Sequence, residues 1–248
     1  MRIAILGTGQ VGIALGSAFA TAGHDVVFGS RSTDQTGLPA PVASTADAAS
    51  SADVILTALP GTSSIPVLDT IGDDALAGKI VLDVSNAVTR EGTLAYPNDS
   101  VGRRMQERFP DVKVVKSLST MFHGVMTDPT AIGATTVFVS GDDEGAKTVV
   151  KSLLADLGWP ETSQLDLGGI ATAVGPLHPA VLRHAAGRRH AHVQHQRRAL
   201  IAVTRETEKP RETGAFSYSC WGTWTRTKNK RIRISRVANY TIPHRSEQ

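Results

Sequence analysis

The sequence predicts an α/β protein with a Rossmann-type, doubly wound and mainly parallel sheet. Three observations lead to this fold class. An apolar run at residues 3–6 passes directly into a glycine-rich turn, short apolar segments alternate with helical patterns of about ten residues, and 248 residues are enough to bury a sizeable core. Ligands of such sheets bind outside the carboxyl ends of the strands, so the residues that follow each strand form the candidate site.

The apolar pattern predicts five elements before residue 52. The apolar residues from Val11 to Ala22 recur at helical spacing, and Gly23 ends that helix. Short apolar runs bounded by turn residues are typical of buried strands. The expected elements are strands at 3–6, 25–28 and 42–44 and helices at 10–22 and 45–51.

The same alternation continues to residue 157. We expect strands at 53–58, 79–84, 112–116 and 135–139 and helices at 62–72, 102–109 and 146–157. Asp142, Asp143 and Glu144 stand just before the last of these helices, where carboxylates suit the helix N-terminus. These acidic residues could also bind a metal ion, but helix capping is the favoured interpretation.

The turn after the first strand reads Gly7-Thr8-Gly9-Gln10-Val11-Gly12, the spacing of a dinucleotide-binding loop. In that context Gly7 makes the tight turn, Gly9 lets the backbone approach a pyrophosphate, and Gly12 lets the helix pack closely. The free N–H groups at the start of the helix then face the phosphates. The alternative is a glycine turn in an α/β protein that binds no nucleotide.

The end of the second strand selects between the two nicotinamide dinucleotides. In Gly29-Ser30-Arg31, Arg31 stands where an NAD site carries a carboxylate. Its guanidinium can bind two oxygens of the ribose 2′-phosphate, and Ser30 can donate a further hydrogen bond. The sequence therefore predicts a site for NADP(H).

Three further strand ends are expected at the same edge of the sheet as the glycine loop. These segments are 58–60, with Leu59 and Pro60, 85–88, with Asn86 and Val88, and 117–121, with Thr120 and Met121. Because a doubly wound sheet gathers such ends in one crevice, they are candidates for the nicotinamide side of the site.

Together these residues resemble the coenzyme F420-dependent NADP reductase family over residues 1 to about 173. The matching segments are 7–12, 29–31, 114–116 with Ser119-Thr120-Met121, Ser140-Gly141-Asp142-Asp143 and Leu165-Asp166-Leu167-Gly168. The resemblance implies hydride transfer between NADPH and a 5-deazaflavin, coenzyme F420, by a homodimer. One departure is Ser119, where related sequences often carry Asn or His.

The resemblance also implies roles for individual residues. Thr8, Gly9, Gln10 and Val11 would hold the pyrophosphate, and Ser30 and Arg31 the 2′-phosphate. The residues near the nicotinamide or the deazaflavin would be Asn86, Val88, Thr120 and Met121.

No catalytic side chain is expected, because two organic hydride carriers need mainly orientation and exclusion of water. His123 could act as a general acid, but a lone histidine beside Met121 and Phe122 is more often a packing or surface residue. Two other functions stay open: reduction of a C=N or C=O bond in a small metabolite, as in pyrroline-carboxylate reductases, and non-catalytic NADP binding.

The chain changes character near residue 174. Residues 1–176 hold 11 Lys+Arg and 19 Asp+Glu, whereas residues 177–248 hold 15 and 4, with six of the eight histidines. Residues 1–176 contain no cysteine, so no disulfide framework is expected in that part. No apolar run approaches the length of about 18 residues that a membrane helix needs, and we expect a cytoplasmic protein.

Three explanations compete for residues 174–248: a basic nucleic-acid-binding tail, a disordered extension, and a shifted reading frame. Shifted by one base, the codons of residues 193–200 permit a Phe-Asn-Ile-x-Val-Val ending before a stop codon. The codons of residues 177–180 permit Tyr-Ile-Pro-Leu, the expected start of the family's C-terminal helix. We therefore expect an NADP-binding domain at 1–173 with the start of the deazaflavin side, a basic tail at 174–248 that is disordered or out of frame, impaired activity and no nucleic-acid partner.

Overall fold

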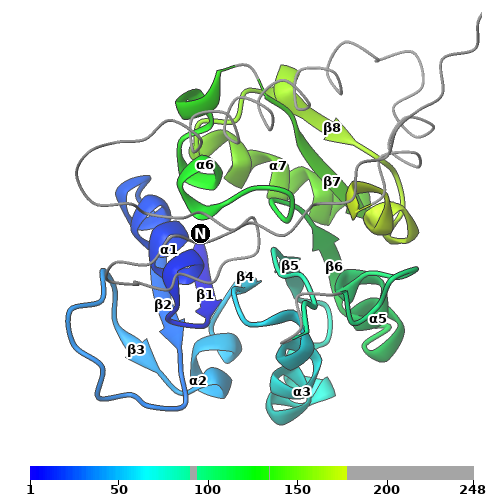
Figure 1. Ribbon diagram of the computed structural model, residues 1–248. Coiled ribbons are helices and arrows are strands. Elements are labelled where there is room, and N and C mark those ends of the chain that lie inside the picture. The colour runs from blue at the N-terminus through cyan, green and yellow to red at the C-terminus, as the bar shows by residue number, and fades with distance from the viewer. Residues whose placement is uncertain (90–93, 134, 178–248) are drawn as a thin grey trace, which may run out of the picture.

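The computed structural model describes residues 1–89, 94–133 and 135–177, and within them eight strands form one sheet with helices on both faces (Figure 1). The strands are β1 (Arg2–Leu6), β2 (Asp25–Gly29), β3 (Val42–Ala43), β4 (Val54–Thr57), β5 (Ile80–Asp83), β6 (Lys113–Lys116), β7 (Val137–Gly141) and β8 (Gln164–Asp166). The α-helices are α1 (Gln10–Thr21), α2 (Thr45–Ser50), α3 (Gly61–Ile71), α4 (Asp73–Leu76), α5 (Val101–Arg108), α6 (His123–Thr127) and α7 (Glu144–Asp156). The 3-10 helices are η1 (Pro129–Ile132), η2 (Glu161–Ser163) and η3 (Ile170–Leu177).

The order of the strands confirms the predicted fold class. The sheet runs β3-β2-β1-β4-β5-β6-β7-β8, and the strands from β3 to β6 are parallel. β7 is antiparallel to β6, and β8 is parallel to β7. The carboxyl ends of β1 to β6 therefore share one edge, and the strand order reverses between β1 and β4, which is where a Rossmann fold binds its ligand.

The predicted strands and helices are all present, with their ends displaced by at most two residues. The structure adds β8, α4 and α6, which the sequence analysis did not predict. β8 has a single apolar residue, Leu165, between Gln164 and Asp166, and the two helices have only four and five residues. Elements this short carry no measurable periodicity.

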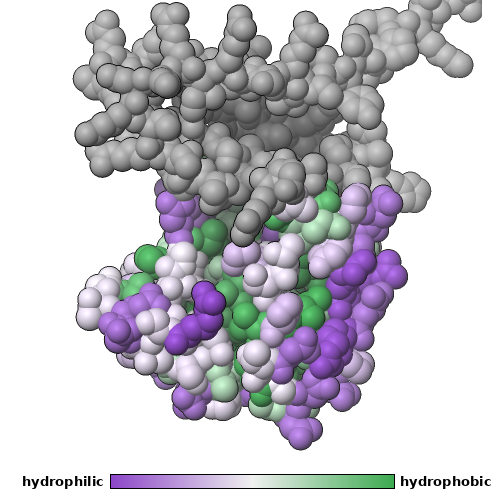
Figure 2. All heavy atoms as spheres, turned by 60° about the horizontal axis from the view of Figure 1, so that its bottom comes forward, coloured by the Kyte–Doolittle hydropathy of each residue, from purple (hydrophilic) through white to green (hydrophobic). Residues whose placement is uncertain are grey.

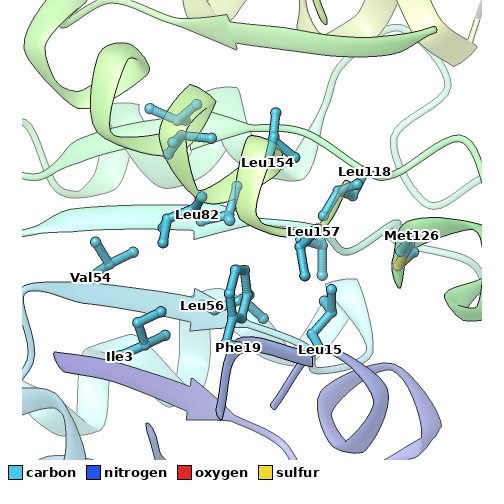
Figure 3. Close-up of a cluster of buried hydrophobic side chains, with 14 of the residues drawn as sticks. Ile3, Leu15, Phe19, Val54, Leu56, Leu82, Leu118, Met126, Leu154 and Leu157 are labelled. Carbon is cyan, nitrogen blue, oxygen red and sulfur yellow. The ribbon is translucent and has the colours of Figure 1, made fainter. Parts of the chain in front are cut away.

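Each face of the sheet buries its own apolar cluster because successive strand residues point to opposite sides. In β1, Ile3 and Ile5 belong to one cluster with residues of α1, α6 and α7. Figure 3 shows Ile3 together with Leu15 and Phe19 of α1, Met126 of α6 and Leu154 of α7. Ala4 and Leu6 pack on the other face, against residues of α2, α3, α4, α5 and η3. Strands buried on both faces are typical of a parallel sheet.

The buried Trp159 joins α7 to α6. Its ring is fully buried, and its indole Nε1 donates a 2.9 Å hydrogen bond to the carbonyl oxygen of Met126 in α6. A buried indole N–H without a partner would be costly, so this bond fixes α6 over the end of the helix that precedes Trp159.

Hydrophilic side chains are most concentrated on one side of the face drawn in Figure 2. On the face in Figure 2 the hydrophilic residues lie mostly to the right, the side on which α5 lies in Figure 1. In α5, Arg103 pairs with Glu107 and Arg108 with Asp69, and all four side chains are more than 40% exposed. Exposed pairs contribute about 0–1 kcal/mol each, so they favour solubility more than stability. None of the described helices is long and apolar enough to cross a membrane.

Candidate functional site

Two glycines of the first loop are required by the protein itself. Gly7 has a φ of +114°, and a Cβ there would lie 2.7 Å from the carbonyl oxygen of Ala58. A Cβ on Gly12 would lie 2.1 Å from the carbonyl oxygen of Gly7. Any side chain at either position would collide with backbone, so the sharp turn from β1 into α1 depends on both residues.

Gly9 is different, because nothing in the part of the chain that the structure describes requires a glycine there. Its φ of −80° and ψ of −178° suit any residue, and a Cβ there would meet no atom within 4 Å. Gly9 is the N-cap of α1, no side chain caps this helix, and its first turn contains no acidic residue. An uncapped helix N-terminus beside open space fits an anionic group that approaches the backbone closely, as the pyrophosphate of a dinucleotide does.

The predicted 2′-phosphate residues lie in the loop after β2. Ser30 is fixed through its backbone N–H, which donates to Ala43, and its Oγ accepts a 2.6 Å hydrogen bond from Nε2 of Gln35. Arg31 is exposed, and its guanidinium makes no ion pair within the described ranges. The nearby carboxylate of Asp34 accepts a hydrogen bond from the hydroxyl of Ser32, which lowers the pKa of Asp34. Arg31 is therefore available to an anionic ligand.

Gln35 is a residue of this loop that the sequence analysis missed. Its side-chain amide bonds both the Ser30 hydroxyl and the carbonyl oxygen of Ser32, at 2.6 and 3.0 Å. The amide leaves the proton of the Ser30 hydroxyl free to be donated to a ligand. Only the folded loop reveals this contact, because Gln35 belongs to no recognisable motif.

The predicted nicotinamide-side residues follow β4, β5 and β6 at the shared edge. Leu59, Asn86, Val88, Thr120 and Met121 are half-buried, and Pro60, the N-cap of α3, is exposed. One hydrogen bond joins two of these segments: Nδ2 of Asn86 donates to the carbonyl oxygen of Ser119, at 2.6 Å. The structure thus brings the loops after β5 and β6 together.

The loop after β6 holds a strained residue. Leu118 is the single non-glycine residue with a positive φ, +57°, among those the structure describes. Its side chain is buried, and the hydroxyl of Ser117 anchors the loop by donating to the carbonyl oxygen of Phe138, at 2.7 Å. Strain of this kind persists only where the surroundings fix the backbone, and it is most common at functional sites.

Beneath these loops lies a row of buried polar residues that sequence reasoning also missed. Thr57, Asp83 and Lys116 are the last residues of β4, β5 and β6 and pair in register, and Ser140 of β7 pairs with Lys116. Each is at most 3% exposed. A polar residue at the end of a short strand normally indicates that the chain is emerging into solvent, and that is why the sequence pattern gave no reason to select them.

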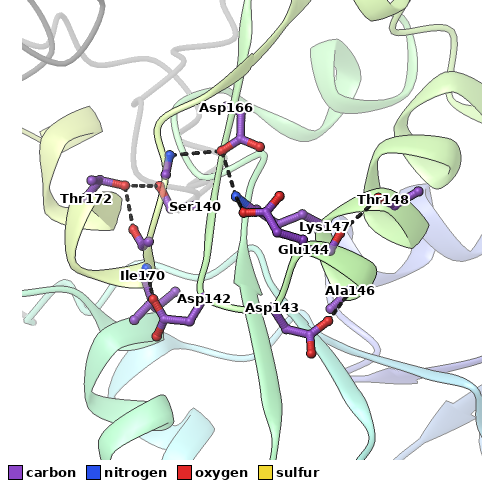
Figure 4. Close-up of polar contacts among 12 residues, drawn as sticks. Ser140, Asp142, Asp143, Glu144, Ala146, Lys147, Thr148, Asp166, Ile170 and Thr172 are labelled. Atoms are coloured by element: carbon purple, nitrogen blue, oxygen red, sulfur yellow. Dashed lines mark hydrogen bonds and ion pairs between the residues drawn. The ribbon is translucent and has the colours of Figure 1, made fainter.

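The acidic segment after β7 anchors the fold (Figure 4). Asp143 is the N-cap of α7, and its Oδ1 accepts from the backbone N–H of Ala146, at 2.7 Å, as predicted. Asp142 accepts from the N–H of Ile170, at 2.8 Å, which fixes the start of η3. Among the described residues no group of three His, Cys, Asp or Glu side chains could hold a metal ion.

The carboxylate of Asp166 joins β8 to α7. It pairs with Lys147 at 3.2 Å and with Lys151 at 2.7 Å, and it accepts from the N–H of Gly168. Burial by itself raises the pKa of Asp166, but these hydrogen bonds outweigh burial and lower it. The largest effect on the pKa of Lys147 is also burial, which lowers it, and the bonds to Glu144 and Asp166 reverse the direction.

Replacing Asp166 with asparagine should lower the free energy of unfolding at pH 7 by about 1–2 kcal/mol. Because the folded pKa is lowered, the carboxylate stabilises the fold above the unfolded pKa of about 4, and this contribution is lost as the pH falls through the folded pKa. The variant should therefore lose less stability between pH 7 and acid pH, as measured by urea unfolding. Asp111→Asn, at an exposed carboxylate, is the control and should match the parent.

His123 begins α6 and is half-buried. Its ring lies edge-on to that of Phe122, with centroids 6.0 Å apart. Its Nε2 is buried and forms no hydrogen bond among the described residues. This aromatic contact is what the packing interpretation predicts.

Comparisons with known proteins decide the family. Residues 2–87 match the family described as NADP oxidoreductase, coenzyme F420-dependent. A provisionally assigned F420-dependent NADP reductase from Arthrobacter sp. FB24 is 38% identical in its solved structure, with a TM-score of 0.66, and the match covers 75% of this chain and 94% of that one. The chain belongs to the F420-dependent NADP reductase family.

One curated relative supports this membership, and a second curated protein of similar sequence is a different reductase. The F420-dependent NADP reductase of Methanocaldococcus jannaschii is 28% identical over 203 residues, covering 71% of this chain and 90% of the relative. The metalloreductase STEAP3 of Rattus norvegicus is 30% identical over 178 residues, covering 69% of this chain, which spans only 35% of that longer relative. Membership of the F420-dependent NADP reductase family makes this protein an NADP-dependent oxidoreductase of the F420-reductase type and confirms the resemblance drawn from its motifs.

Proposed function

We propose that the protein transfers a hydride between NADP(H) and coenzyme F420. The observation that carries the NADP side of this proposal is Gly9, a glycine that the fold does not need, at an uncapped helix N-terminus. The deazaflavin side is supported by the names of the relatives from Arthrobacter and Methanocaldococcus. In the balanced reaction NADPH, coenzyme F420 and one proton give NADP⁺ and the reduced deazaflavin.

When bound, NADPH would supply the hydride that the deazaflavin takes up together with one proton. The chain would hold the pyrophosphate with the backbone of residues 8–11 and the 2′-phosphate with Ser30 and Arg31. Around the reacting rings we place the half-buried residues of the three strand ends, Leu59, Asn86, Val88, Thr120 and Met121, with Pro60 at the rim. Their role is to orient the two rings and exclude water, so we assign no catalytic side chain.

We also propose that the tail impairs the deazaflavin side. Ile170 and Ala173 of η3 are buried against the rest of the fold, and η3 continues to Leu177. The proposed out-of-frame tail starts at 174, so all of it except residues 174–177 lies outside the described residues. A chain read in the shifted frame from residue 177 would carry the family's own C-terminal helix, and we expect it to form the homodimer.

The test is titration with NADPH and NADH, followed by addition of coenzyme F420 and of a cyclic imine as a competing substrate. We expect tight binding of NADPH and weak binding of NADH. We also expect slow reduction of the deazaflavin and no reduction of the imine. The frame-restored chain should react at least about tenfold faster, because correct placement of reactants contributes large rate factors. Reduction of the imine alone would contradict the proposed substrate, and equal deazaflavin turnover by both chains would contradict the proposed impairment.

A further inference from the structure

The buried pair of Asp83 and Lys116 holds the loop that follows β5. Nζ of Lys116 lies 2.8 Å from Oδ2 of Asp83 and also donates to the carbonyl oxygen of Ser85. Oδ1 of Asp83 accepts from the backbone N–H of Ser85 at 2.9 Å, from its hydroxyl at 2.6 Å, and from the hydroxyl of Thr57 at 3.1 Å. All three polar atoms of Ser85 are therefore bound to the pair.

The next residue is fixed from both sides. The backbone N–H of Gly61 donates to the carbonyl oxygen of Asn86, and a Cβ on Gly61 would lie 2.5 Å from that residue's carbonyl carbon. The side chain of Asn86 is bonded to Ser119 in the loop after β6. Because Ser85 and Asn86 are adjacent in the chain, the bonds that fix Ser85 also restrict the position of Asn86, a residue of the candidate site.

An ion pair at this depth is not needed for stability. Burying two charges removes their hydration, and apolar residues of the same volume usually stabilise a core as well or better. The space around the pair is adapted to it: a Cβ on Gly102 of α5 would lie 3.3 Å from Cβ and Cδ of Lys116. What the pair supplies is a set of directional bonds to one loop at the ligand-binding edge.

We propose that Asp83 and Lys116 are positioning residues, which hold Ser85–Val88 in the geometry that receives the nicotinamide end of NADP(H). Neither side chain need touch the cofactor, because both act through Ser85 and Asn86. Both the identity of the hydride acceptor and the contact between residues 85–88 and the nicotinamide end rest on the proposed function.

Two double variants separate the charges from the hydrogen bonds. Asp83→Leu/Lys116→Met removes both charges and the carboxylate that accepts from the backbone N–H and hydroxyl of Ser85. Asp83→Asn/Lys116→Met also removes both charges but keeps an amide oxygen where Oδ1 accepts from Ser85. The control is Lys113→Met, the same substitution at the opposite, exposed end of β6, where the lysine pairs with Asp143. Circular dichroism and urea unfolding establish that each variant is folded.

The measurement compares the dissociation constant of NADPH with that of 2′,5′-ADP, which has the 2′-phosphate but no nicotinamide. In Asp83→Leu/Lys116→Met we expect NADPH to bind about tenfold more weakly and 2′,5′-ADP to bind as in the parent, because only the nicotinamide end loses its contacts. Hydride transfer should fall by about a hundredfold, since small misplacements at a reacting centre have effects of that size. Lys113→Met should match the parent in all three quantities. Asp83→Asn/Lys116→Met keeps an acceptor for Ser85 but lacks the Lys116 donor, so its losses should lie between those of the parent and Asp83→Leu/Lys116→Met.

Unchanged NADPH binding and rate in folded Asp83→Leu/Lys116→Met would overturn the proposal, as would an equal loss for NADPH and 2′,5′-ADP. If that variant does not fold, Ser85→Ala decides, because it removes one bond to Asp83 and leaves the ion pair intact. It should weaken NADPH binding about threefold without affecting 2′,5′-ADP, and no change would overturn the proposal. A parent protein that never reduces coenzyme F420 would refute the proposed function, while the binding comparison would still test the positioning role.

Discussion

Replacing Arg31 with alanine should weaken the binding of NADPH by about ten- to a hundredfold and leave the binding of NADH unchanged. Hydrogen bonds between a guanidinium and a phosphate contribute about 1.5–3 kcal/mol, and each 1.4 kcal/mol is a factor of ten in affinity. The side chain is exposed and unpaired within the described residues, so its loss should not destabilise the fold. Fluorescence titration with both dinucleotides measures the effect.

Two further variants sharpen this result. Arg104→Ala removes the same charge from α5, where Arg104 pairs with Asp99 and lies over the ring of Tyr96, and it should bind NADPH normally. Gln35→Ala should cost about threefold in NADPH affinity, because it leaves the Ser30 hydroxyl without the amide that orients it. Equal affinity of the parent protein for NADPH and NADH would remove the role assigned to Arg31.

The parts of the fold that the sequence predicts well are those in which burial is repeated along one element. β1 is apolar at every position that the sheet buries, and Leu15 and Phe19 of α1 fall on its buried face. The direction of β7 is not encoded in this way. An apolar run such as Val137-Phe138-Val139 suits a parallel or an antiparallel neighbour equally, so only the path of the chain through α6 decides.

The residues of the candidate site also differ in whether their requirements are local in the chain or depend on distant contacts. The glycine loop could be predicted because its requirements are local: a positive φ at Gly7 and a backbone contact at Gly12 act within one turn. The pair of Asp83 and Lys116 could not, because its partners are 33 residues apart in the chain and meet only through the strand register. A charged residue that is buried by pairing has the same sequence signature as one that is solvated.

The substitutions Gly9→Ala and Gly12→Ala should have opposite consequences although they lie three residues apart. A methyl group on Gly9 meets no atom of the described residues within 4 Å and suits the extended backbone there, so the fold should keep its stability within about 1 kcal/mol. The same group on Gly12 would sit 2.1 Å from the carbonyl oxygen of Gly7, and we expect a loss of about 3 kcal/mol or more. Thermal and urea unfolding measure both.

The Gly9→Ala substitution, which should leave stability nearly unchanged, should still weaken the binding of NADPH. The Gly9→Ala variant should be folded and yet bind NADPH at least about tenfold more weakly, because the methyl group takes the space through which a pyrophosphate approaches the helix N-terminus. A glycine that only the fold requires cannot give that result, since its replacement would lower the free energy of unfolding without a specific loss of NADPH affinity. Gly23→Ala, at a φ of +87° beyond the far end of α1, provides the matched control, which should lose stability without a specific loss of NADPH affinity. If Gly9→Ala binds NADPH like the parent, the open space beside Gly9 is not the pyrophosphate site, and the assignment of the loop would rest on the family alone.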